Sequence, residues 1–446
     1  MRSLILSIFI LGFGCQNSIS ANLEPNTNKS EKYVIIPDEN FERALKKLGY
    51  DKNINGKVLR KNVCGIRKLN LIVFRRIKDL TGIEAFTSLT DLDCRGNILT
   101  NLDLSNNTAL KSLKCDGNEL TSLNVRGYNA LTYLSCNDNR LTSLDIGGCT
   151  ALTILSCWRN NLTSLDVRSC TSLTDLDCRG NRLTNLDLSN NSALENLHCS
   201  ENQLTSLDVS KNIALKSLKC NRGGYYGDKN LLSLDIRGCT SLTDLDCSSN
   251  DLTTLDVRGC TALTDLDCSS NDLTTLDVRG CTALTDLDCG WNELKSLDLS
   301  KNTALRILSI EGEGPYYEPV SLDLSNNIVL TKLSCSCNQL KKLDFGNNID
   351  LEKKAELLGG QKMMYEYLKT NIKYPEEAEK NGIKGKVLVA FTVYENGEIR
   401  DVKVVKGSHY LLDNEALRVV RAMPNWCRPI QKGKVVNKEY TIPIKF

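Results

Sequence analysis

Cysteine and histidine are the residues that could give this chain redox, metal-binding or nucleophilic chemistry. The sequence holds 20 cysteines but only two histidines, His198 and His409, which stand far apart. No CxxC pair occurs, and Cys335 and Cys337 are the nearest approach to one. Without a clustered ligand set, a base beside a nucleophile or a phosphate-binding loop, the sequence predicts no enzyme, no metal and no cofactor.

Sixteen of the cysteines fall into two columns of constant spacing. Eleven follow the pattern LxxLx: Cys94, Cys115, Cys136, Cys157, Cys178, Cys199, Cys220, Cys247, Cys268, Cys289 and Cys335. Five lie half a period away: Cys149, Cys170, Cys239, Cys260 and Cys281. Stacked coils would place equivalent side chains parallel and about 4.8 Å apart, which suits small buried residues better than disulfides.

The spacing comes from a unit of 21 residues that recurs twelve times over residues 89–350. The clearest copies, LTDLDCSSNDLTTLDVRGCTA, occupy residues 242–262 and 263–283. A fixed period of this length indicates a solenoid whose coils bury their apolar faces against one another. Alternation in LxLxC predicts one short strand per coil, with leucine and cysteine pointing inward.

An asparagine stands three residues after most first-column cysteines, so the pattern reads LxxLxCxxNxL. This pattern closely resembles the leucine-rich repeat signature, nested here as 10 + 11 residues. The resemblance implies a leucine-rich repeat β-solenoid-like array. The asparagine is expected to turn the chain inward and to satisfy buried backbone groups. The second half, LTTLDVRGC, repeats the design on the opposite wall, with cysteine or asparagine in its last position.

Aspartates form a further column beside the second strand, from Asp103 to Asp344. Unneutralised carboxylates at this spacing would raise one another's pKa values. Nearby arginines could offset the repulsion: Arg126, Arg168, Arg237, Arg258 and Arg279. We interpret this column as structural.

Two coils carry insertions, at residues 221–230 and 311–320, and each insertion brings a tyrosine pair. The pairs are Tyr225–Tyr226 and Tyr316–Tyr317. Insertions on one side of a solenoid often bind ligands, and tyrosine is enriched at interfaces. Surface insertions are also tolerated without a purpose, so these tyrosines are candidates for a ligand-binding loop and no more.

The first residues read as a secretory signal, with Arg2, an apolar run and then Cys15. The run is too short for a membrane span. It resembles a lipoprotein signal, which implies lipidation of Cys15, while ordinary cleavage near Ser20 or Ala21 is the alternative. Residues 33–63 predict a capping subdomain, with a helix that runs through Leu48 and has Asp38 as its N-cap.

After residue 350 the 21-residue repeat ends and the sequence pattern changes. Residues 361–371 predict an amphipathic helix, and residues 386–405 predict two strands around a turn at Asn396-Gly397. A second helix is expected over residues 413–423 with Asp413 as its N-cap, followed by a last strand over residues 435–446. The order predicts a small α+β domain with a three-stranded antiparallel sheet.

The segments YLKTNIKYPEEAEKNGIKGKV, VYENGEIRDVKVVKG, LDNEALRVVRAMPNW and YTIPIKF closely resemble the C-terminal domain of the TonB family. That domain binds an extended segment of an outer-membrane receptor by strand addition. The candidate edge strand is Val435, Val436, Asn437, Lys438, Glu439, Tyr440 and Thr441. The membrane helix and Pro-rich spacer of an energy transducer have no counterpart here, with 8 prolines in all, so the resemblance implies binding and leaves force transmission open.

The expected organisation combines these parts. It has a signal peptide over residues 1–14, a flexible tether over 15–32, a cap with an irregular first repeat over 33–88, the repeats over 89–350, a linker over 351–359 and a TonB-like domain over 360–446. We expect a periplasmic or outer-membrane protein, held to the membrane only by lipid. Its solenoid would bind a protein or glycan, and its terminal domain would bind a TonB-dependent receptor or another envelope protein. The alternative function is that of a surface adhesin, in which the solenoid does the binding and the TonB-like domain is an accessory module. A net charge of +2 does not imply nucleic acid.

Overall fold

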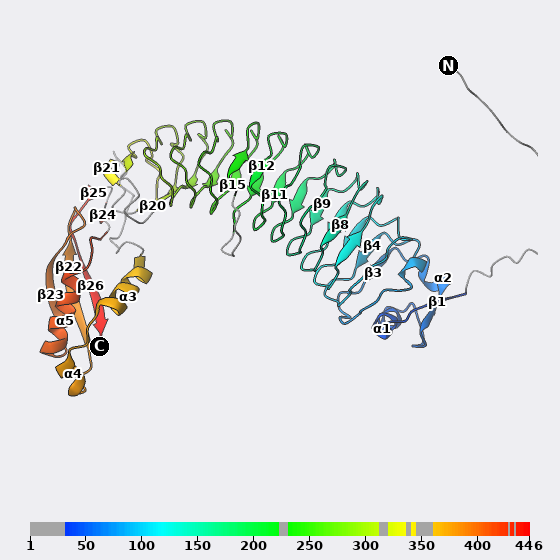
Figure 1. Cartoon of the computed structure of the whole chain (residues 1–446), viewed down its shortest axis with the longest axis horizontal. Coiled ribbons are helices and arrows are strands. Elements are labelled where there is room, and N and C mark those ends of the chain that lie inside the picture. The colour runs from blue at the N-terminus through cyan, green and yellow to red at the C-terminus, as the bar shows by residue number, and fades with distance from the viewer. Residues whose placement is uncertain are drawn as a thin grey trace, which may run out of the picture.

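The repeats stack into a long arc, seen in a computed structural model of the chain (Figure 1). The structure describes residues 32–222, 231–311, 320–335, 340–344, 360–426, 429–431 and 434–446. A β-solenoid runs over residues 68–334, and a small α+β domain follows it. The predicted fold class is therefore confirmed.

One parallel sheet of thirteen strands lines the inner side of the arc. Each of the twelve repeats contributes one strand, and the irregular first repeat contributes β3. The strands are β3 (Lys68–Asn70), β4 (Asp91–Asp93), β5 (Ser112–Lys114), β7 (Tyr133–Ser135), β9 (Ile154–Ser156), β10 (Asp175–Asp177), β11 (Asn196–His198), β13 (Ser217–Lys219), β15 (Asp244–Asp246), β16 (Asp265–Asp267), β17 (Asp286–Asp288), β18 (Ile307–Ile310) and β20 (Lys332–Cys335).

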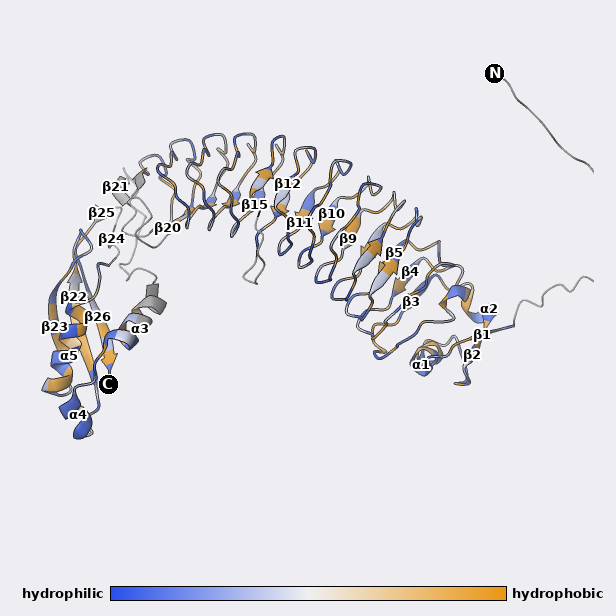
Figure 2. Ribbon diagram, viewed as in Figure 1, coloured by the Kyte–Doolittle hydropathy of each residue, from blue (hydrophilic) through white to orange (hydrophobic). Residues whose placement is uncertain are grey.

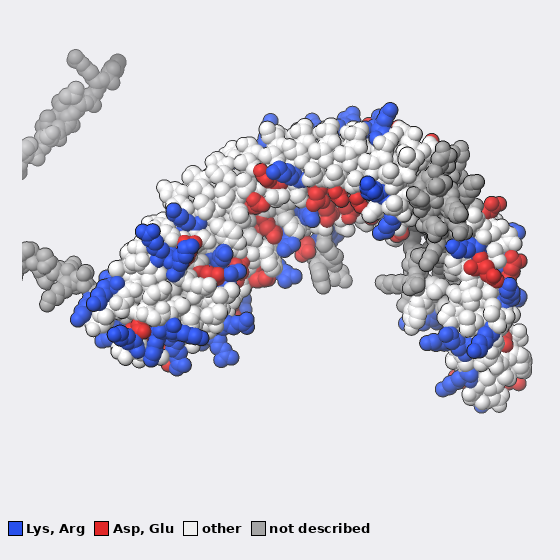
Figure 3. All heavy atoms as spheres, turned by 180° about the vertical axis from the view of Figure 1, so that it is seen from behind, with Lys and Arg blue, Asp and Glu red and all other residues white. Residues whose placement is uncertain are grey.

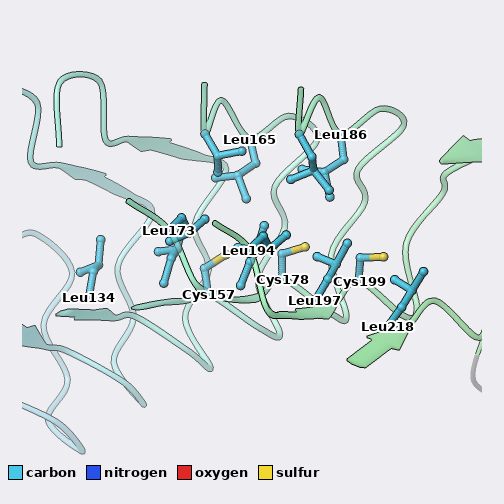
Figure 4. Packing of buried hydrophobic residues seen from close by; sticks show 14 of the residues in the cluster. Leu134, Cys157, Leu165, Leu173, Cys178, Leu186, Leu194, Leu197, Cys199 and Leu218 are labelled. Atoms are coloured by element: carbon cyan, nitrogen blue, oxygen red, sulfur yellow. The ribbon is translucent and has the colours of Figure 1, made fainter. Parts of the chain in front are cut away.

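Leucine and cysteine build the core in continuous columns. The central leucines of neighbouring strands are in register, as Leu176 is with Leu197, and both are almost fully buried. A cysteine follows most of these strands and points into the same core, so Cys157, Cys178 and Cys199 stack along the solenoid (Figure 4). The apolar residues recur at the same places in successive coils (Figure 2). The inward alternation predicted from LxLxC is confirmed.

Buried asparagines connect each coil to the one before it. The side-chain amide of Asn181 donates to the carbonyl oxygens of Cys178, at 2.9 Å, and of Cys157 in the preceding coil, at 3.0 Å. Its Oδ1 accepts the backbone N–H of Leu162 at 3.1 Å. The same arrangement recurs at Asn118, Asn139, Asn160, Asn202, Asn250, Asn271 and Asn292. These amides replace backbone partners that a tight turn cannot supply.

The opposite wall forms strands only in places. Among the described residues it has three parallel pairs, whose members are β6 (Ser122–Asn124) with β8 (Ser143–Asp145), β12 (Ser206–Asp208) with β14 (Ser233–Asp235), and β19 (Val320–Asp323) with β21 (Leu340–Asp344). An arc separates its coils more on the outer side than on the inner side. The backbone ladder is therefore continuous on the inner wall and interrupted here.

The second-column position accepts Asn, Cys or Tyr because all three can donate to one carbonyl. Asn191 donates to Val167 O at 3.0 Å, and the Cys149 thiol donates to Val125 O at 3.2 Å. Tyr128 fills the same position and donates to Leu104 O. Each acceptor lies 24 residues earlier, on the preceding coil. Four of the five cysteines of this column, Cys149, Cys170, Cys239 and Cys281, are thus hydrogen-bond donors as well as small core residues.

The N-terminal cap covers the first coil. It contains β1 (Tyr33–Ile35), α1 (Glu39–Lys47), β2 (Lys57–Leu59), α2 (Arg60–Val63) and the 3-10 helix η1 (Ile83–Ala85). Asp38 is the N-cap of α1, as predicted, and accepts the N–H of Phe41 at 2.9 Å. Gly82 allows η1 to approach the cap, since a Cβ there would lie 2.3 Å from Ile36 Cδ1.

The C-terminal domain is a three-stranded antiparallel sheet with helices. Its elements are α3 (Gly360–Asn371), α4 (Glu376–Lys380), β22 (Lys386–Val393), β23 (Ile399–Lys406), α5 (Tyr410–Arg421), β24 (Ile430–Gln431), β25 (Lys434–Val435) and β26 (Lys438–Lys445). The sheet order is β23-β22-β26, which confirms the predicted sheet. Its core includes Phe391, Trp426 and Val419.

Two local predictions for this domain are wrong. The helix expected from Asp413 begins at Tyr410, and His409 is its N-cap. Asp413 lies inside the first turn, where it accepts the N–H of Ser408 at 2.9 Å. The strand expected over residues 435–446 is divided, because Val436 and Asn437 separate β25 from β26. Asn437 instead accepts the N–H of Glu395 at 2.9 Å.

Candidate functional site

The inner sheet carries an acidic hollow that the repeat pattern alone did not single out. Strands β15, β16 and β17 each read Asp-Leu-Asp, with the leucine buried and both aspartates on the open face. The hollow has a volume of about 530 Å³. We call its six carboxylates the acidic section: Asp244, Asp246, Asp265, Asp267, Asp286 and Asp288. Acidic side chains gather on the inner side of the arc (Figure 3).

Parallel register brings these carboxylates opposite one another. Asp246 pairs with Asp267, and Asp267 with Asp288, in adjacent strands. Burial raises the pKa of Asp267, and the charges of Asp246 and Asp288 raise it further, against hydrogen bonds from Ser269. Within the described ranges, the ion pair of this section is Lys219 with Asp244, at 3.6 Å. The section therefore carries net negative charge, with six carboxylates against two lysines, Lys219 and Lys332, in the lining of the hollow.

The aspartate column of the opposite wall behaves differently. Asp277 binds Arg279 through two hydrogen bonds, of 2.9 and 2.8 Å, and also accepts the Arg279 backbone N–H. These bonds lower the pKa of Asp277 to about 2. Asp166, Asp235 and Asp256 are paired in the same way with Arg168, Arg237 and Arg258. Where the arginine is absent, as at Asp298, the carboxylate still accepts the N–H two residues on, from Ser300.

Each described aspartate of this opposite-wall column thus stabilises the turn that follows it by accepting a backbone N–H. The mutual rise in pKa expected for bare carboxylates does not occur at the paired positions, because the arginines offset it as foreseen. Arg126 is the looser case, 3.6 Å from Asp145. A hollow of about 550 Å³ lies along this wall, between Asp208 and Asp277. Asp235, Asp256 and Asp277 in this hollow are paired with arginines, and Asp208 accepts the N–H of Ser210.

The cysteine thiols of the two columns are buried and unreactive. The fifteen column cysteines whose side chains the structure describes, all but Cys335, are free and buried. Burial raises the pKa of Cys199 to about 12 and that of Cys149 to about 11, so both are protonated at neutral pH. A thiol is a poor nucleophile and metal ligand compared with a thiolate. Over the described residues, no three Cys, His, Asp or Glu side chains form a cluster that could hold a metal ion.

The predicted partner-binding residues lie mostly at an edge of the C-terminal sheet. Lys438, Glu439, Tyr440 and Thr441 belong to β26, the outer strand next to β22. This strand pairs with β22 over eight consecutive residues without a register shift. Val435 lies in β25 instead. The other outer strand, β23, is irregular, with two register shifts and a positive φ at Asp401.

Five other predicted site residues lie outside the described residues. They are Cys15, Tyr225, Tyr226, Tyr316 and Tyr317. Their roles stay predictions. Within the described chain, no helix combines the length and apolar character needed to cross a bilayer.

A long parallel-stranded solenoid with matched Leu, Cys and Asn columns, joined to a small sheet with a regular edge strand, defines a repeat protein built for protein interaction. The chain belongs to the leucine-rich repeat family and carries a TonB-type C-terminal domain. Residues 370–446 match the family of the Gram-negative bacterial TonB protein C-terminal domain.

Solved structures support this assignment. The functional domain of InlJ from Listeria monocytogenes, which includes a cysteine ladder, is 37% identical with a TM-score of 0.60, over 72% of this chain and 75% of that one. The leucine-rich repeat protein LIC12759 of Leptospira interrogans is 24% identical with a TM-score of 0.54, over 66% and 78% of the two chains, and shows the fold alone. A search of curated proteins finds no match.

Both parts belong to protein-interaction folds, and the TonB-type domain is typical of the Gram-negative envelope. The chain is a protein-binding envelope protein.

Proposed function

We propose that the two parts of this non-enzymatic protein bind different partners in the cell envelope. The solenoid recognises a protein or glycan. The TonB-type domain docks by β-strand addition to a TonB-dependent receptor or another periplasmic partner, which links the solenoid to outer-membrane transport. A lipid on Cys15 holds the chain to the membrane.

The regular outer strand β26 carries this proposal. Edge strands present unpaired backbone groups that an extended segment can pair with. Pro443 lies within β26, opposite Leu388, and has no N–H to give to β22. Proline fits an edge strand only where its nitrogen faces outward. Thr441 and Glu439 lie two and four residues before Pro443, so their N–H groups face the same open side.

The experiment uses the full chain as bait in a detergent-solubilised Gram-negative envelope fraction. The test variant carries Glu439→Pro and Thr441→Pro, which remove two outward donors and leave the ladder to β22 in place. The matched control carries Glu439→Ala and Thr441→Ala, which keep both N–H groups. Circular dichroism of all three proteins establishes that they are folded.

Strand addition predicts that the wild-type chain and the alanine control enrich TonB-dependent receptors, while the proline variant loses them. Equal enrichment by all three would reject strand addition at β26. If none of the three enriches such receptors, the domain is an accessory module, and the adhesin alternative becomes the better account of the chain.

A further inference from the structure

The open face of the inner sheet changes its chemistry along the arc. On β7 and β9 the outward residues include Tyr133 and Ile154, and Trp158 follows β9 closely. We call these three residues the apolar section. The acidic section begins four strands further along, at β15. One sheet therefore offers two different surfaces to any molecule that lies across it.

Cations of the same coil and of neighbouring coils lie against the aromatic rings of the apolar section. The guanidinium groups of Arg159 and Arg179 lie 5.3 and 5.2 Å from the centre of the Trp158 ring. Lys114 Nζ lies 5.2 Å from the centre of the Tyr133 ring. Ile154 is 36% exposed, although a sheet residue of this type is usually buried. Fixed aromatic and aliphatic side chains of this kind are typical anchors for a partner side chain.

The charge of the acidic section indicates which partner fits. Its six carboxylates lie on three adjacent strands, and Lys219 forms an ion pair with one of them, Asp244. Asp265 and Asp267, on the middle strand, each have an aspartate opposite them on both neighbouring strands. A partner with positive charge would relieve this repulsion, whereas a nucleic acid or another polyanion would be repelled.

The distance between the two sections sets the partner's dimensions. Four strand steps separate β9 from β15, and six separate β9 from β17. At about 4.8 Å per step, the span is roughly 19 to 29 Å. An extended polypeptide rises about 3.3 Å per residue, so about six to nine residues cover this span.

We propose that the inner sheet binds an extended polypeptide whose apolar or aromatic side chain seats on Tyr133, Ile154 and Trp158 while its basic residues, about six to nine positions away, contact the acidic section. This inference deepens the proposed function, because it rests on the solenoid being a recognition element and names the chemistry of its partner. It does not depend on strand addition by β26.

The test measures binding of fluorescein-labelled synthetic peptides to the full chain by fluorescence anisotropy. The reference peptide has one tryptophan, a Gly/Ser spacer of about seven residues and four lysines. Three companions replace the tryptophan by glycine, replace the lysines by glutamates, or shorten the spacer to two residues. We expect each companion to bind at least about tenfold more weakly, since loss of an anchor or of charge complementarity has that effect.

Variants of the protein show which section of the inner sheet each end of the peptide contacts. Trp158→Ala should lower affinity for the reference peptide about tenfold, without further loss for the peptide that lacks tryptophan. The double variant with Asp265→Asn and Asp286→Asn should likewise lower affinity for the reference peptide. It should cause no further loss for the peptide in which glutamates replace the lysines. Asp256→Asn on the opposite wall is the matched control and should leave affinity unchanged. Circular dichroism checks that each variant is folded.

Three results would overturn the proposal. Equal binding of the reference and glycine-substituted peptides would mean that the acidic section attracts cations without an anchor. Insensitivity to spacer length would mean that the two sections do not act together. Tighter binding of the glutamate peptide or of a single-stranded DNA probe would contradict the assigned charge. Each of these results leaves the pull-down at β26 unaffected, so failure here is distinct from failure of receptor docking.

Discussion

The side-chain amide of Asn118 donates a hydrogen bond to the carbonyl oxygen of Cys94 in the preceding coil, at 3.1 Å. Its Oδ1 accepts the N–H of Leu99, also in that coil, at 3.0 Å. One buried side chain therefore supplies hydrogen-bond partners to two backbone groups of the preceding coil. Such links explain why the asparagine column is as regular as the leucine columns.

Replacing Asn118 by alanine should lower the free energy of unfolding by about 1–3 kcal/mol, because buried backbone groups lose their partners. Asn118→Asp should cost more, since a buried carboxylate cannot donate to the carbonyls of Cys94 and Cys115. Urea unfolding followed by far-ultraviolet circular dichroism measures both changes. The exposed Asn129 supplies the control, and an equal effect of Asn129→Ala would remove the ladder explanation.

Asn191→Cys should be tolerated better than Asn191→Ala. The Asn191 amide donates to Val167 O and Cys170 O, and a thiol can replace one of these bonds, as Cys149 does to Val125 O. Within the described structure, the buried Oδ1 of Asn191 has no partner, and cysteine would remove it. We expect a loss below about 1 kcal/mol for cysteine and about 1–3 kcal/mol for alanine. Thermal unfolding of both variants under reducing conditions tests this order, and a reversed order would contradict the shared-acceptor explanation.

Asp38 joins the capping helix to the first repeat. Its Oδ1 accepts the N–H of Phe41, and its Oδ2 accepts those of Lys78, at 2.8 Å, and Asp79, at 3.2 Å. Asp38→Ala should cost about 1–2 kcal/mol, as for other lost N-caps. Hydrogen exchange should accelerate both in α1 and at residues 78–79. Glu39→Ala, which removes only an exposed pair with Arg43, should leave exchange at residues 78–79 unchanged.

Asp267→Asn should stabilise the protein at pH 7. The pKa of Asp267 is raised in the folded state, so its favourable contribution exists below the unfolded pKa and is lost as pH rises through the folded pKa. Removing the charge relieves repulsion from Asp246 and Asp288, worth about 0.2–1 kcal/mol for opposed cross-strand residues. The gain should shrink at pH 3, where the carboxyl is protonated. Melting temperatures at the two pH values measure it.

The effect of pH on stability should have the opposite sign at Asp277, because Arg279 lowers the pKa of this carboxyl group. This stabilisation is present above the unfolded pKa and is lost as pH falls through the folded pKa. Asp277→Asn should therefore not stabilise the protein at pH 7. Stabilisation by both substitutions would indicate a general charge effect instead of the two distinct environments.

Much of the solenoid could be predicted because each column has one physical task. Leucine and cysteine at alternate positions must face a core, and an asparagine after them must supply donors where the backbone turns. The helix that begins after Asp38 was also predictable, since an N-cap acts locally. The helix near Asp413 was misplaced because His409 can accept the same kind of bond and lies earlier in the chain.

The acidic section was harder to find, although its signal was present. Three successive units read LTDLDC, and the aspartates look like ordinary surface residues within any one unit. Only when the strands are stacked in register do Asp246, Asp267 and Asp288 face one another. The same stacking brings Arg179, one repeat away in the sequence, onto the ring of Trp158.

The amino-acid sequence by itself determined the repeat, its buried columns and the TonB-type domain, because period, alternation and capping are local properties of a chain. The tertiary structure alone decided where charge stays unmatched. On the opposite wall each of four aspartates, Asp166, Asp235, Asp256 and Asp277, pairs with an arginine two residues away in the same coil. On the inner wall the neighbours come from other coils, and their distance depends on how closely the strands stack.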